Sequence, residues 1–350
     1  MKSEEIARLA GVSRSTVSRV INNYPNVPQA TRDKVMKVIK KYNFEPNVSA
    51  RVLAGKGTDT LGLFLFSIYD KKNPLRVYGN SYFGPFLDAV VDTGNYKGFY
   101  ILIHTIYTPQ ECRYIYQTFS QRRIDGGIII GTESNPEIET VISNTNYPLA
   151  IIDYDPDEIK KIMHKDGKIV VINSLDRKGI SKCIDELVSL GHKEIGFIEG
   201  RKTTYSGYVR KDEFIKSMNR HGLELKNEYI LKGDFVRDKT EKEVAKMINK
   251  GRLPTAIIAS NDEMALAAMD TFRAHNISIP EDISIIGFDD SPVASLVEPS
   301  LTTVRIPFYT MAQKAVQALS EMIKGKAEGL LHYQVDVELI WRKSCTKNKI

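Results

Sequence analysis

The sequence has few cysteines, no long apolar run and no group of metal-ligating side chains. Its three cysteines, Cys112, Cys183 and Cys345, are far apart and odd in number. This excludes a disulfide framework and fits a reducing compartment. No apolar run approaches the roughly 20 residues that a membrane helix needs, no signal pattern opens the chain, and the six histidines are scattered. We therefore expect a cytoplasmic protein with no membrane partner, metal or cofactor of its own.

Motifs of common enzyme classes are also missing. The chain has no Gly-x-Ser-x-Gly elbow, no phosphate-binding lysine loop and no Gly-x-Gly-x-x-Gly after its first predicted strand. The adjacent carboxylates Asp289 and Asp290 are candidates for acid–base work, but a turn at the end of a strand explains the pair more simply. The expectation is that the chain is not an enzyme.

Positive charge is concentrated in the first sixth of the chain. Residues 1–57 hold eleven Lys and Arg against four Asp and Glu, whereas residues 58–350 hold 38 against 39. A small basic module joined to a nearly neutral body indicates that only the module meets a polyanion. A length of 350 residues leaves room for two or three domains.

The basic module is predicted to contain three short helices. The first begins at Ser3, a plausible N-cap, and is followed by a tight turn at Gly11. Ser13 then caps a second helix, and a third helix begins at about Gln29. Two helices joined by a short glycine turn form the helix-turn-helix pattern, in which the second helix enters the DNA major groove.

The second predicted helix has an apolar face and a polar face. Val17, Val20 and Ile21 are spaced to pack inside the module, whereas arginine and hydroxyl side chains occupy the other face. Arginine reads guanine through paired hydrogen bonds. The alternative is a basic surface helix that serves only solubility. The predicted DNA contacts of this helix and its flanks are Ser13, Arg14, Ser15, Thr16, Ser18, Arg19 and Asn22.

A further short helix is predicted at about 47–54. Pro46 precedes it, and Gly55 and Gly57 stop it. A helix of this length is unstable alone in water, so it would fold only against a partner. Leu53 is placed to act as an apolar wedge between base steps in the minor groove. A plain interdomain linker is the alternative.

From Thr60 onward, strands alternate with helices. Nearly continuous Ile, Val and Leu runs, such as 61–68, 124–131 and 255–260, favour parallel sheets covered on both faces. A second series of elements starts at residue 168, which predicts two similar α/β lobes. In such sheets, ligands bind at the carboxyl ends of the strands and often between lobes.

A resemblance to a known family rests on IARLAGVSRSTVSRVINN, VSARVLAGK, DGGIIIG, LGHKEIGFIEG and DISIIGFDDS. These blocks resemble the lactose-repressor (LacI/GalR) family of bacterial transcription regulators. The resemblance implies a helix-turn-helix headpiece (1–57, hinge helix at about 47–54) and a two-lobed core like that of periplasmic binding proteins (58–350). It implies an N-lobe of about 60–163 and 309–334 and a C-lobe of about 164–308 and 335–345.

The resemblance also implies a homodimer on near-palindromic operator DNA. By this resemblance Arg14 and Ser15 are the principal base readers, and Arg19 supports them. In the implied hinge helix, leucines from two subunits open the central base step. The residues assigned to that helix are Asn47, Ala50 and Leu53.

The same resemblance implies an effector site between the lobes. Arg210 and Asp289 are suited to clasp vicinal hydroxyls or a carboxylate-bearing sugar. Each polar residue in the set is alternatively a cap or turn residue. The predicted effector contacts are Asp153, Ser206, Arg210, Asn261 and Asp289, with Phe235 as a stacking platform and Tyr82, Phe83 and Phe308 as pocket walls.

The effector class stays open at this stage. A sugar or sugar derivative is the family's commonest choice, and the alternatives are a purine-type corepressor, a phosphoprotein partner, or a solute-binding role without DNA. The stretch SIYDKKNPLRVYGNSYFGPF is longer than usual for the family. This stretch either reads an anionic effector or forms a solvated surface loop. The residues that would contact such an effector are Tyr69, Lys71, Lys72, Arg76 and Tyr78.

Overall fold

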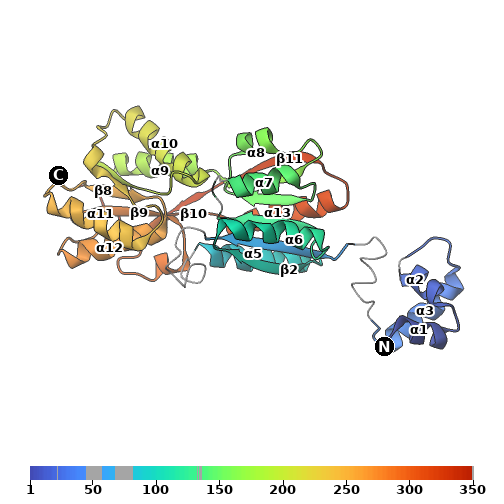
Figure 1. The fold of residues 1–350 in the computed structure, drawn as a ribbon. Helices are drawn as coiled ribbons and strands as arrows, with labels where there is room; N and C mark the ends of the chain where they lie inside the picture. Colours follow the sequence, from blue (N-terminus) through green and yellow to red (C-terminus); the bar gives the residue numbers. More distant parts are fainter. Residues whose placement is uncertain (22, 45–56, 68–81, 132, 134–135, 349–350) are drawn as a thin grey trace. The chain divides into compact units, whose positions relative to one another are not determined.

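The chain forms two compact units, Met1–Thr58 and Asp59–Ile350 (Figure 1). The computed structural model describes residues 1–21, 23–44, 57–67, 82–131, 133 and 136–348. The predicted DNA contacts Asn22, Asn47, Ala50 and Leu53 lie outside these residues, and so do the five residues singled out in the 69–78 stretch. Within the described part, every helix is too short or too polar to span a bilayer.

The first unit contains the three predicted helices. They are α1 (Ser3–Ala10), α2 (Arg14–Ile21) and α3 (Gln29–Lys41). The side chains of Ile6, Val17, Val20 and Val35 are at most 3% exposed and form the centre of one small apolar core. Ser3 is the first helical residue and not the expected cap. Lys2 occupies the N-cap position, where its N–H donates to Glu5 Oε2 at 2.8 Å.

Gly11 makes the turn between α1 and α2. Its φ of 62° lies in the left-handed region, and the next amide, Val12 N–H, donates to the carbonyl of Ala7 at 3.0 Å. This closes α1 in the manner of a Schellman cap. Only glycine adopts this conformation without a steric cost from a Cβ atom.

Replacing Gly11 by alanine is expected to destabilise the first unit by about 1–2 kcal/mol, because an L-residue pays this cost in the left-handed region. A Cβ there would meet nothing closer than Lys34 Nζ at 3.5 Å, so backbone strain dominates. Amide hydrogen exchange measures the change in stability, in α1 and α2 for this variant and in α5 (Phe83–Tyr96) for its control. Gly84→Ala on α5, where a Cβ meets nothing, is the matched control and should be neutral or stabilising. Equal losses in both variants would contradict the strain argument.

The first sheet of the second unit has six strands in the order β11, β5, β4, β3, β1, β2, and all neighbours are parallel. This agrees with the predicted parallel architecture. Its strands are β1 (Thr60–Phe66), β2 (Tyr100–Ile106), β3 (Gly126–Ile130), β4 (Leu149–Ile152), β5 (Lys168–Ser174) and β11 (Gly329–Val335).

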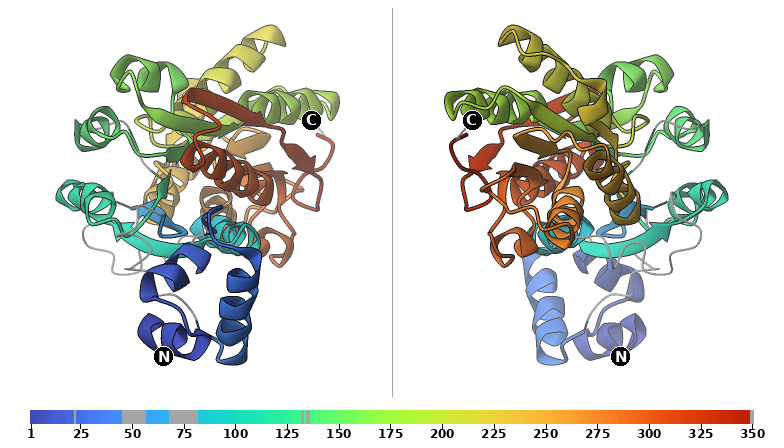
Figure 2. Two further views of the ribbon diagram at one scale, coloured as in Figure 1. Left: turned by 90° about the vertical axis from the view of Figure 1, so that its right-hand side faces the viewer. Right: turned by 90° about the vertical axis from the view of Figure 1, so that its left-hand side faces the viewer.

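Helices cover both faces of this sheet (Figure 2). One face packs against α5 and α13, and the other packs against α6, α7, α8 and the 3₁₀ turn η1. Alternate strand residues serve the two sides: Leu61 and Leu63 join the first cluster, whereas Phe64 and Phe66 join the second. The bounds are α13 (Phe308–Ile323), α6 (Arg113–Ser120), α7 (Pro136–Asn144), α8 (Pro156–Ile162) and η1 (Pro109–Cys112).

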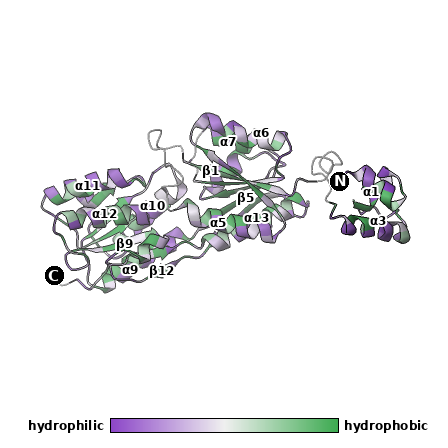
Figure 3. Cartoon of the chain, turned by 90° about the horizontal axis from the view of Figure 1, so that it is seen from below, coloured by the Kyte–Doolittle hydropathy of each residue, from purple (hydrophilic) through white to green (hydrophobic). Residues whose placement is uncertain are grey.

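The second sheet has the order β12, β10, β9, β8, β6, β7, and only β12 runs antiparallel to its neighbour. Helices α9 and α10 cover one face, and α11 and α12 cover the other. Figure 3 shows the apolar residues concentrated in the strands and the polar ones toward the helix surfaces. The bounds are β6 (Ile195–Glu199), β7 (Ile230–Lys232), β8 (Ala256–Ala259), β9 (Ser284–Asp289), β10 (Thr302–Arg305), β12 (Glu338–Ile340), α9 (Asp176–Ser189), α10 (Tyr205–Arg220), α11 (Arg237–Asn249), α12 (Asp262–Ala274), and the 3₁₀ turns η2 (Asn227–Tyr229) and η3 (Pro292–Ser295).

The expected lobe boundary at 163/164 is wrong. Strand β5, which we expected to open the C-lobe, pairs with β4 and β11 in the first sheet. The chain therefore first crosses between the sheets after Ser174. It returns between β10 and α13 and crosses again between β11 and β12. The apolar run of β5 predicts a buried strand, but nothing in that run specifies which sheet the strand joins.

Candidate functional sites

The start of α2 is held by local hydroxyl contacts. Ser13 Oγ accepts a hydrogen bond from Thr16 N–H at 3.1 Å, so Ser13 is the N-cap that the sequence predicts. Ser13 Oγ also lies 2.8 Å from Ser15 Oγ and 2.9 Å from Thr16 Oγ1. These contacts fix the orientation of the first helical turn, where the predicted base-reading residues lie.

One face of α2 is exposed and basic. Arg14, Ser15, Ser18 and Arg19 are exposed, whereas the apolar positions between them are buried. Arg14 Nη1 lies 3.2 Å from Glu4 Oε1, an acidic partner that inspection of α2 alone did not find. Both side chains are more than 60% exposed, and such pairs contribute only about 0–1 kcal/mol. The pair therefore leaves Arg14 available to a stronger anionic partner.

Arg32 braces the far end of α2. Its guanidinium donates to Asn23 Oδ1 and to the carbonyl of Tyr24, both at 2.7 Å. Asn23 has a φ of 56°, and Tyr24 N–H donates to the Arg19 carbonyl at 3.0 Å, which closes the helix. Sequence reasoning missed this residue, because its role depends on α3 packing beside the end of α2.

A second cluster of predicted site residues lies at or just after the carboxyl ends of strands in the second unit. Asp153 follows β4, and Ser206 occupies the second position of α10 after β6. Ser206 Oγ donates to Asp153 Oδ2 at 2.6 Å, so this hydrogen bond joins the two lobes. Asp289 is the last residue of β9. The topology thus brings together residues that lie far apart in the sequence, as expected for open parallel sheets.

Arg210 is the centre of this cluster. Its side chain is 4% exposed, its Nε donates to Asp176 Oδ2 at 2.7 Å, and its Nη1 lies 3.9 Å from Asp289 Oδ1. Nη1 also donates to the Ser260 carbonyl, and the guanidinium lies 3.8 Å from the ring centroid of Phe288. Burial opposes its charge, but the carboxylates, Asp176 first, leave the pKa of Arg210 raised. Arg210 is therefore a fixed, buried cation.

Three carboxylates, those of Asp153, Asp176 and Asp289, interact with the single cation Arg210. Burial, followed by repulsion from Asp176, raises the pKa of Asp153 to about 6. Burial likewise raises the pKa of Asp289 well above its ordinary value, against the lowering effect of Arg210. Asp289 Oδ1 is buried and accepts no hydrogen bond from the described residues. The Asp289 carboxylate consequently has an unused hydrogen-bond acceptor.

Three predicted aromatic residues form a wall beside the cluster. The ring of Tyr82 lies 5.6 Å from Phe83 and 5.2 Å from Phe308, both in edge-to-face geometry. Burial raises the pKa of Tyr82, and the charges of Asp153 and Asp289 raise it further.

Phe235 and Asn261 have local structural partners. Phe235 has a φ of 62°, and its ring covers Gly200, where a Cβ would come within 2.2 Å of it. Asn261 Oδ1 accepts from Met264 N–H at 2.9 Å and caps α12. Within the described residues, the Asn261 side chain makes no hydrogen bond to the cluster. Asn261 therefore has the role of a helix cap, which is the alternative to effector binding that the sequence analysis gives for the polar residues of this set.

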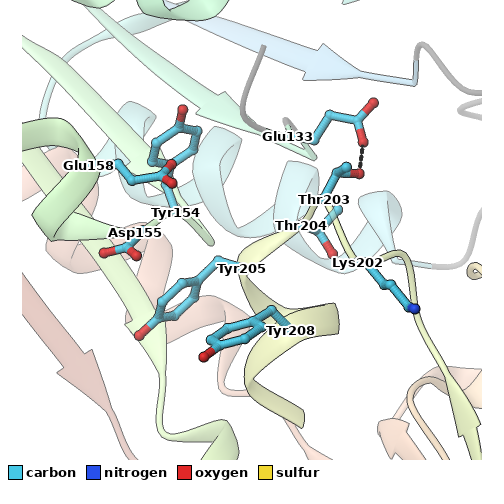
Figure 4. Close-up of a pocket in the computed structure, with 9 residues that line it drawn as sticks. All are labelled: Glu133, Tyr154, Asp155, Glu158, Lys202, Thr203, Thr204, Tyr205 and Tyr208. Carbon is cyan, nitrogen blue, oxygen red and sulfur yellow. Dashed lines mark hydrogen bonds between the residues drawn. The ribbon is translucent and has the colours of Figure 1, made fainter. Parts of the chain in front are cut away.

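A pocket of about 410 Å³ opens next to the cluster (Figure 4). Both lobes contribute to it, and Thr203 Oγ1 donates to Glu133 across the boundary. None of the predicted effector contacts lines this pocket, although Tyr154 follows Asp153 and Tyr205 precedes Ser206. The lining residues are Glu133, Tyr154, Asp155, Glu158, Lys202, Thr203, Thr204, Tyr205 and Tyr208.

Comparisons with known proteins place the chain in a family. Residues 4–47 match the bacterial regulatory proteins of the lacI family, and residues 184–345 match a periplasmic binding protein-like domain. The regulator DegA of Bacillus subtilis (strain 168) is 32% identical over 344 residues, which cover 97% of this chain and 96% of that protein. The chain belongs to the lacI family.

Two further comparisons extend this finding. The transcriptional repressor PurR of Pasteurella multocida (strain Pm70) is 29% identical over 343 residues, 97% of each chain. A Lac repressor dimer, solved bound to operator and the anti-inducer ONPF, has a TM-score of 0.79 at 25% identity and covers 99% of both chains. This lacI-family protein is a DNA-binding transcription regulator. The predicted family, fold class and non-enzymatic function are confirmed.

Sequence reasoning about this lacI-family protein missed Asp176 and the pocket lining. Asp176 begins α9 and reads as an ordinary helix-start acid, so its contact with Arg210 becomes visible only in the folded chain. The pocket residues follow β3, β4 and β6 and extend onto the first turns of α8 and α10, and Tyr154 and Tyr205 are each one residue from a position that the resemblance supplied. The aromatic and acidic residues that follow these strands were the available signal.

Replacing Asp153 by asparagine is expected to change how stability depends on pH. The folded pKa of about 6 exceeds the ordinary value of 3.8, so the native state binds the extra proton and stability falls as pH rises through this window. The asparagine amide would keep an acceptor for Ser206 and remove this loss. Relative to the unchanged chain, we expect a gain at pH 7.5 that is on the order of 1–2 kcal/mol larger than at pH 4.5. Urea unfolding at the two pH values measures it, and a pH-independent difference would contradict the assignment.

Proposed function

We propose that this regulator is a homodimeric repressor of near-palindromic operator DNA, controlled by a small molecule bound between its lobes. The effector is a sugar or sugar derivative. The observation that carries the proposal is the exposed basic face of α2 in a chain whose excess positive charge lies entirely in residues 1–57. The near-neutral core supplies no comparable attraction for a polyanion.

The proposed base readers are Arg14 and Ser15, with Arg19 in support. They lie on consecutive turns of one helix whose buried face fixes its rotation. Because recognition helices contact bases through their N-terminal residues, this placement supports direct readout. Ser13, Thr16 and Ser18 belong to the proposed contact surface, as do four residues outside the described structure: Asn22, Asn47, Ala50 and Leu53.

The dimer is proposed from symmetry and similarity. A two-fold dimer presents two recognition helices at a fixed spacing, which matches a palindromic site. The similar Lac repressor structure is a dimer bound to its operator. A single headpiece with one short recognition helix offers few base contacts, so pairing two of them supports specific binding.

The proposed effector site is the cluster around Arg210 with its aromatic wall. Buried charges, unfilled acceptor capacity and flat aromatic surfaces in one cluster are typical of small-molecule sites. We include Asp153, Ser206, Asp289, Tyr82, Phe83 and Phe308 in this site, with Phe235 and Asn261 at its edge. A purine-type corepressor is the second candidate, because the Tyr82–Phe308 wall also suits a planar base.

Selection from a randomised duplex library tests the proposal. The full chain should enrich a palindromic sequence and bind it at least about 10³-fold more tightly than bulk DNA at physiological salt. Size exclusion with light scattering should show a dimer that carries one duplex. A chain that prefers no sequence over bulk DNA would refute the repressor function.

A further inference from the structure

The charge of the pocket next to the Arg210 cluster indicates the chemical class of the effector. This inference rests on the proposed function. Three carboxylates line the pocket: Glu133, Asp155 and Glu158. The cation in its lining is Lys202, which is exposed. Glu133 also lies 3.8 Å from Arg201 Nη1, which partly neutralises it. The remaining acids, Asp155 and Glu158, lie together at the start of α8, where Asp155 is the N-cap and Glu158 belongs to the first turn.

These two acids have unused acceptor capacity. Glu158 makes no hydrogen bond or ion pair with any described residue. Asp155 uses Oδ1 to accept from Asp157 N–H at 2.9 Å and so caps α8. Its second oxygen makes no such bond within the described chain. Two carboxylates in a recessed wall therefore offer at least three oxygen atoms to a donor.

Aromatic rings face this acidic wall. Figure 4 shows Tyr205 and Tyr208 on the opposite side, both carried by α10. Burial raises the pKa of Tyr205, and the charges of Asp155 and Asp153 raise it further. An aromatic face attracts a cation and also covers the apolar face of a sugar ring.

The deeper cluster offers a second place for a ligand that donates hydrogen bonds. Asp289 is 4% exposed and its Oδ1 accepts no hydrogen bond from the described residues. Arg210 is shared among Asp176, the Ser260 carbonyl and Asp289. An anion beside this cluster would add a negative charge next to three acids, Asp153, Asp176 and Asp289, that share one arginine.

We propose that the effector is a sugar-like polyol bearing a protonated amino group. A ring hydroxyl donates to Asp289, and the ammonium occupies the pocket between Asp155, Glu158 and the ring of Tyr205. Between these two ends, the ligand lies across the hydrogen bond that Ser206 donates to Asp153. This assigns the pocket as the subsite that discriminates by charge, and the buried cluster as the subsite that recognises hydroxyls.

Calorimetry with the full chain and a matched set of sugars tests the proposal. Glucose, glucosamine and glucuronate, with their galactose counterparts, vary one substituent between hydroxyl, ammonium and carboxylate. In at least one series the affinity of the ammonium form should be at least about tenfold that of the hydroxyl form, because charge-assisted hydrogen bonds are roughly twice as strong as neutral ones. The carboxylate form should bind weakest. A carboxylate form that equals or exceeds the ammonium form overturns the proposal, and so does the absence of binding by any ammonium form.

Two variants assign the preference to the pocket. Glu158→Gln and Asp155→Asn keep the shape, and asparagine keeps the α8 cap. Both should reduce the ammonium preference, because the ammonium form should lose more affinity than the hydroxyl form. Asp157→Asn is the matched control, an exposed acid on the same helix that does not line the pocket. An unchanged preference in both pocket variants overturns the assignment. Operator binding without ligand reports on the proposed function separately, since it depends on neither acid.

Discussion

Replacing Arg210 by methionine is expected to remove the effector response and to destabilise the second unit by about 3–5 kcal/mol, the usual cost of deleting one partner of a buried ion pair. The loss has a specific origin. Arg210 is 4% exposed and provides the charge that faces Asp176 and Asp289. Without it, both carboxylates remain buried with no opposing charge beside them. Urea unfolding of the full chain measures the loss.

An exposed arginine of the same helix supplies the control. Arg220 is 51% exposed and lies 3.6 Å from Asp185 and 3.7 Å from Glu213. Arg220→Met removes the same charge from α10, yet we expect a loss of no more than about 1 kcal/mol, because Arg220 is half exposed and Glu213 keeps Arg177 at 3.6 Å. Similar losses in the two variants would show that burial does not govern the stability that Arg210 provides.

A second substitution separates stability from recognition. Asp176→Asn in the Arg210→Met background removes one uncompensated charge and should recover part of the lost stability. The effector response should stay absent, because no guanidinium remains to bind the ligand. The response is measured as the ligand-induced change in operator affinity. A normal response in the double variant would place the effector elsewhere.

The strands of the core could be predicted because burial on both faces leaves a local signature. Runs such as Ile128–Ile130 and Ile285–Ile286 are apolar without alternation, and the helices between them have the period that packing on a sheet requires. The partner of a strand leaves no such signature. Strand β5 therefore joins the first sheet against expectation, since its apolar run does not specify the sheet to which it belongs.

The residues of the candidate sites also divide into those that local sequence predicts and those whose partners depend on long-range packing. Ser13 could be predicted as a cap because it acts on an amide three residues away. Glu4 as the partner of Arg14, and Asp176 as the partner of Arg210, depend on which helices pack together. Arg210 itself was found through a family resemblance, and the resemblance did not extend to the pocket beside it. Long-range pairing is thus the step at which a single sequence stops being informative about function.

Replacing Arg14 by alanine is expected to weaken operator binding by about 1–3 kcal/mol, the value of a paired arginine–base contact. Binding to random duplex should fall much less, because a single lost charge removes only about one counterion from the salt dependence. Fluorescence anisotropy at several salt concentrations measures both affinities. Equal losses on operator and random DNA would reduce Arg14 to a phosphate contact.

Glu4→Gln should act in the opposite direction to Arg14→Ala. Glu4 is the acid that lies 3.2 Å from the Arg14 guanidinium, and its charge is close to the proposed DNA surface. Its removal frees Arg14 from an exposed ion pair and lowers the repulsion of phosphate, so operator affinity should rise by a few tenths of a kcal/mol up to about 1 kcal/mol. In the Arg14→Ala background, the part of this gain that comes from freeing Arg14 should vanish. A gain of equal size in both backgrounds would mean that Glu4 acts on DNA only through its own charge and that the Arg14–Glu4 contact has no influence on recognition.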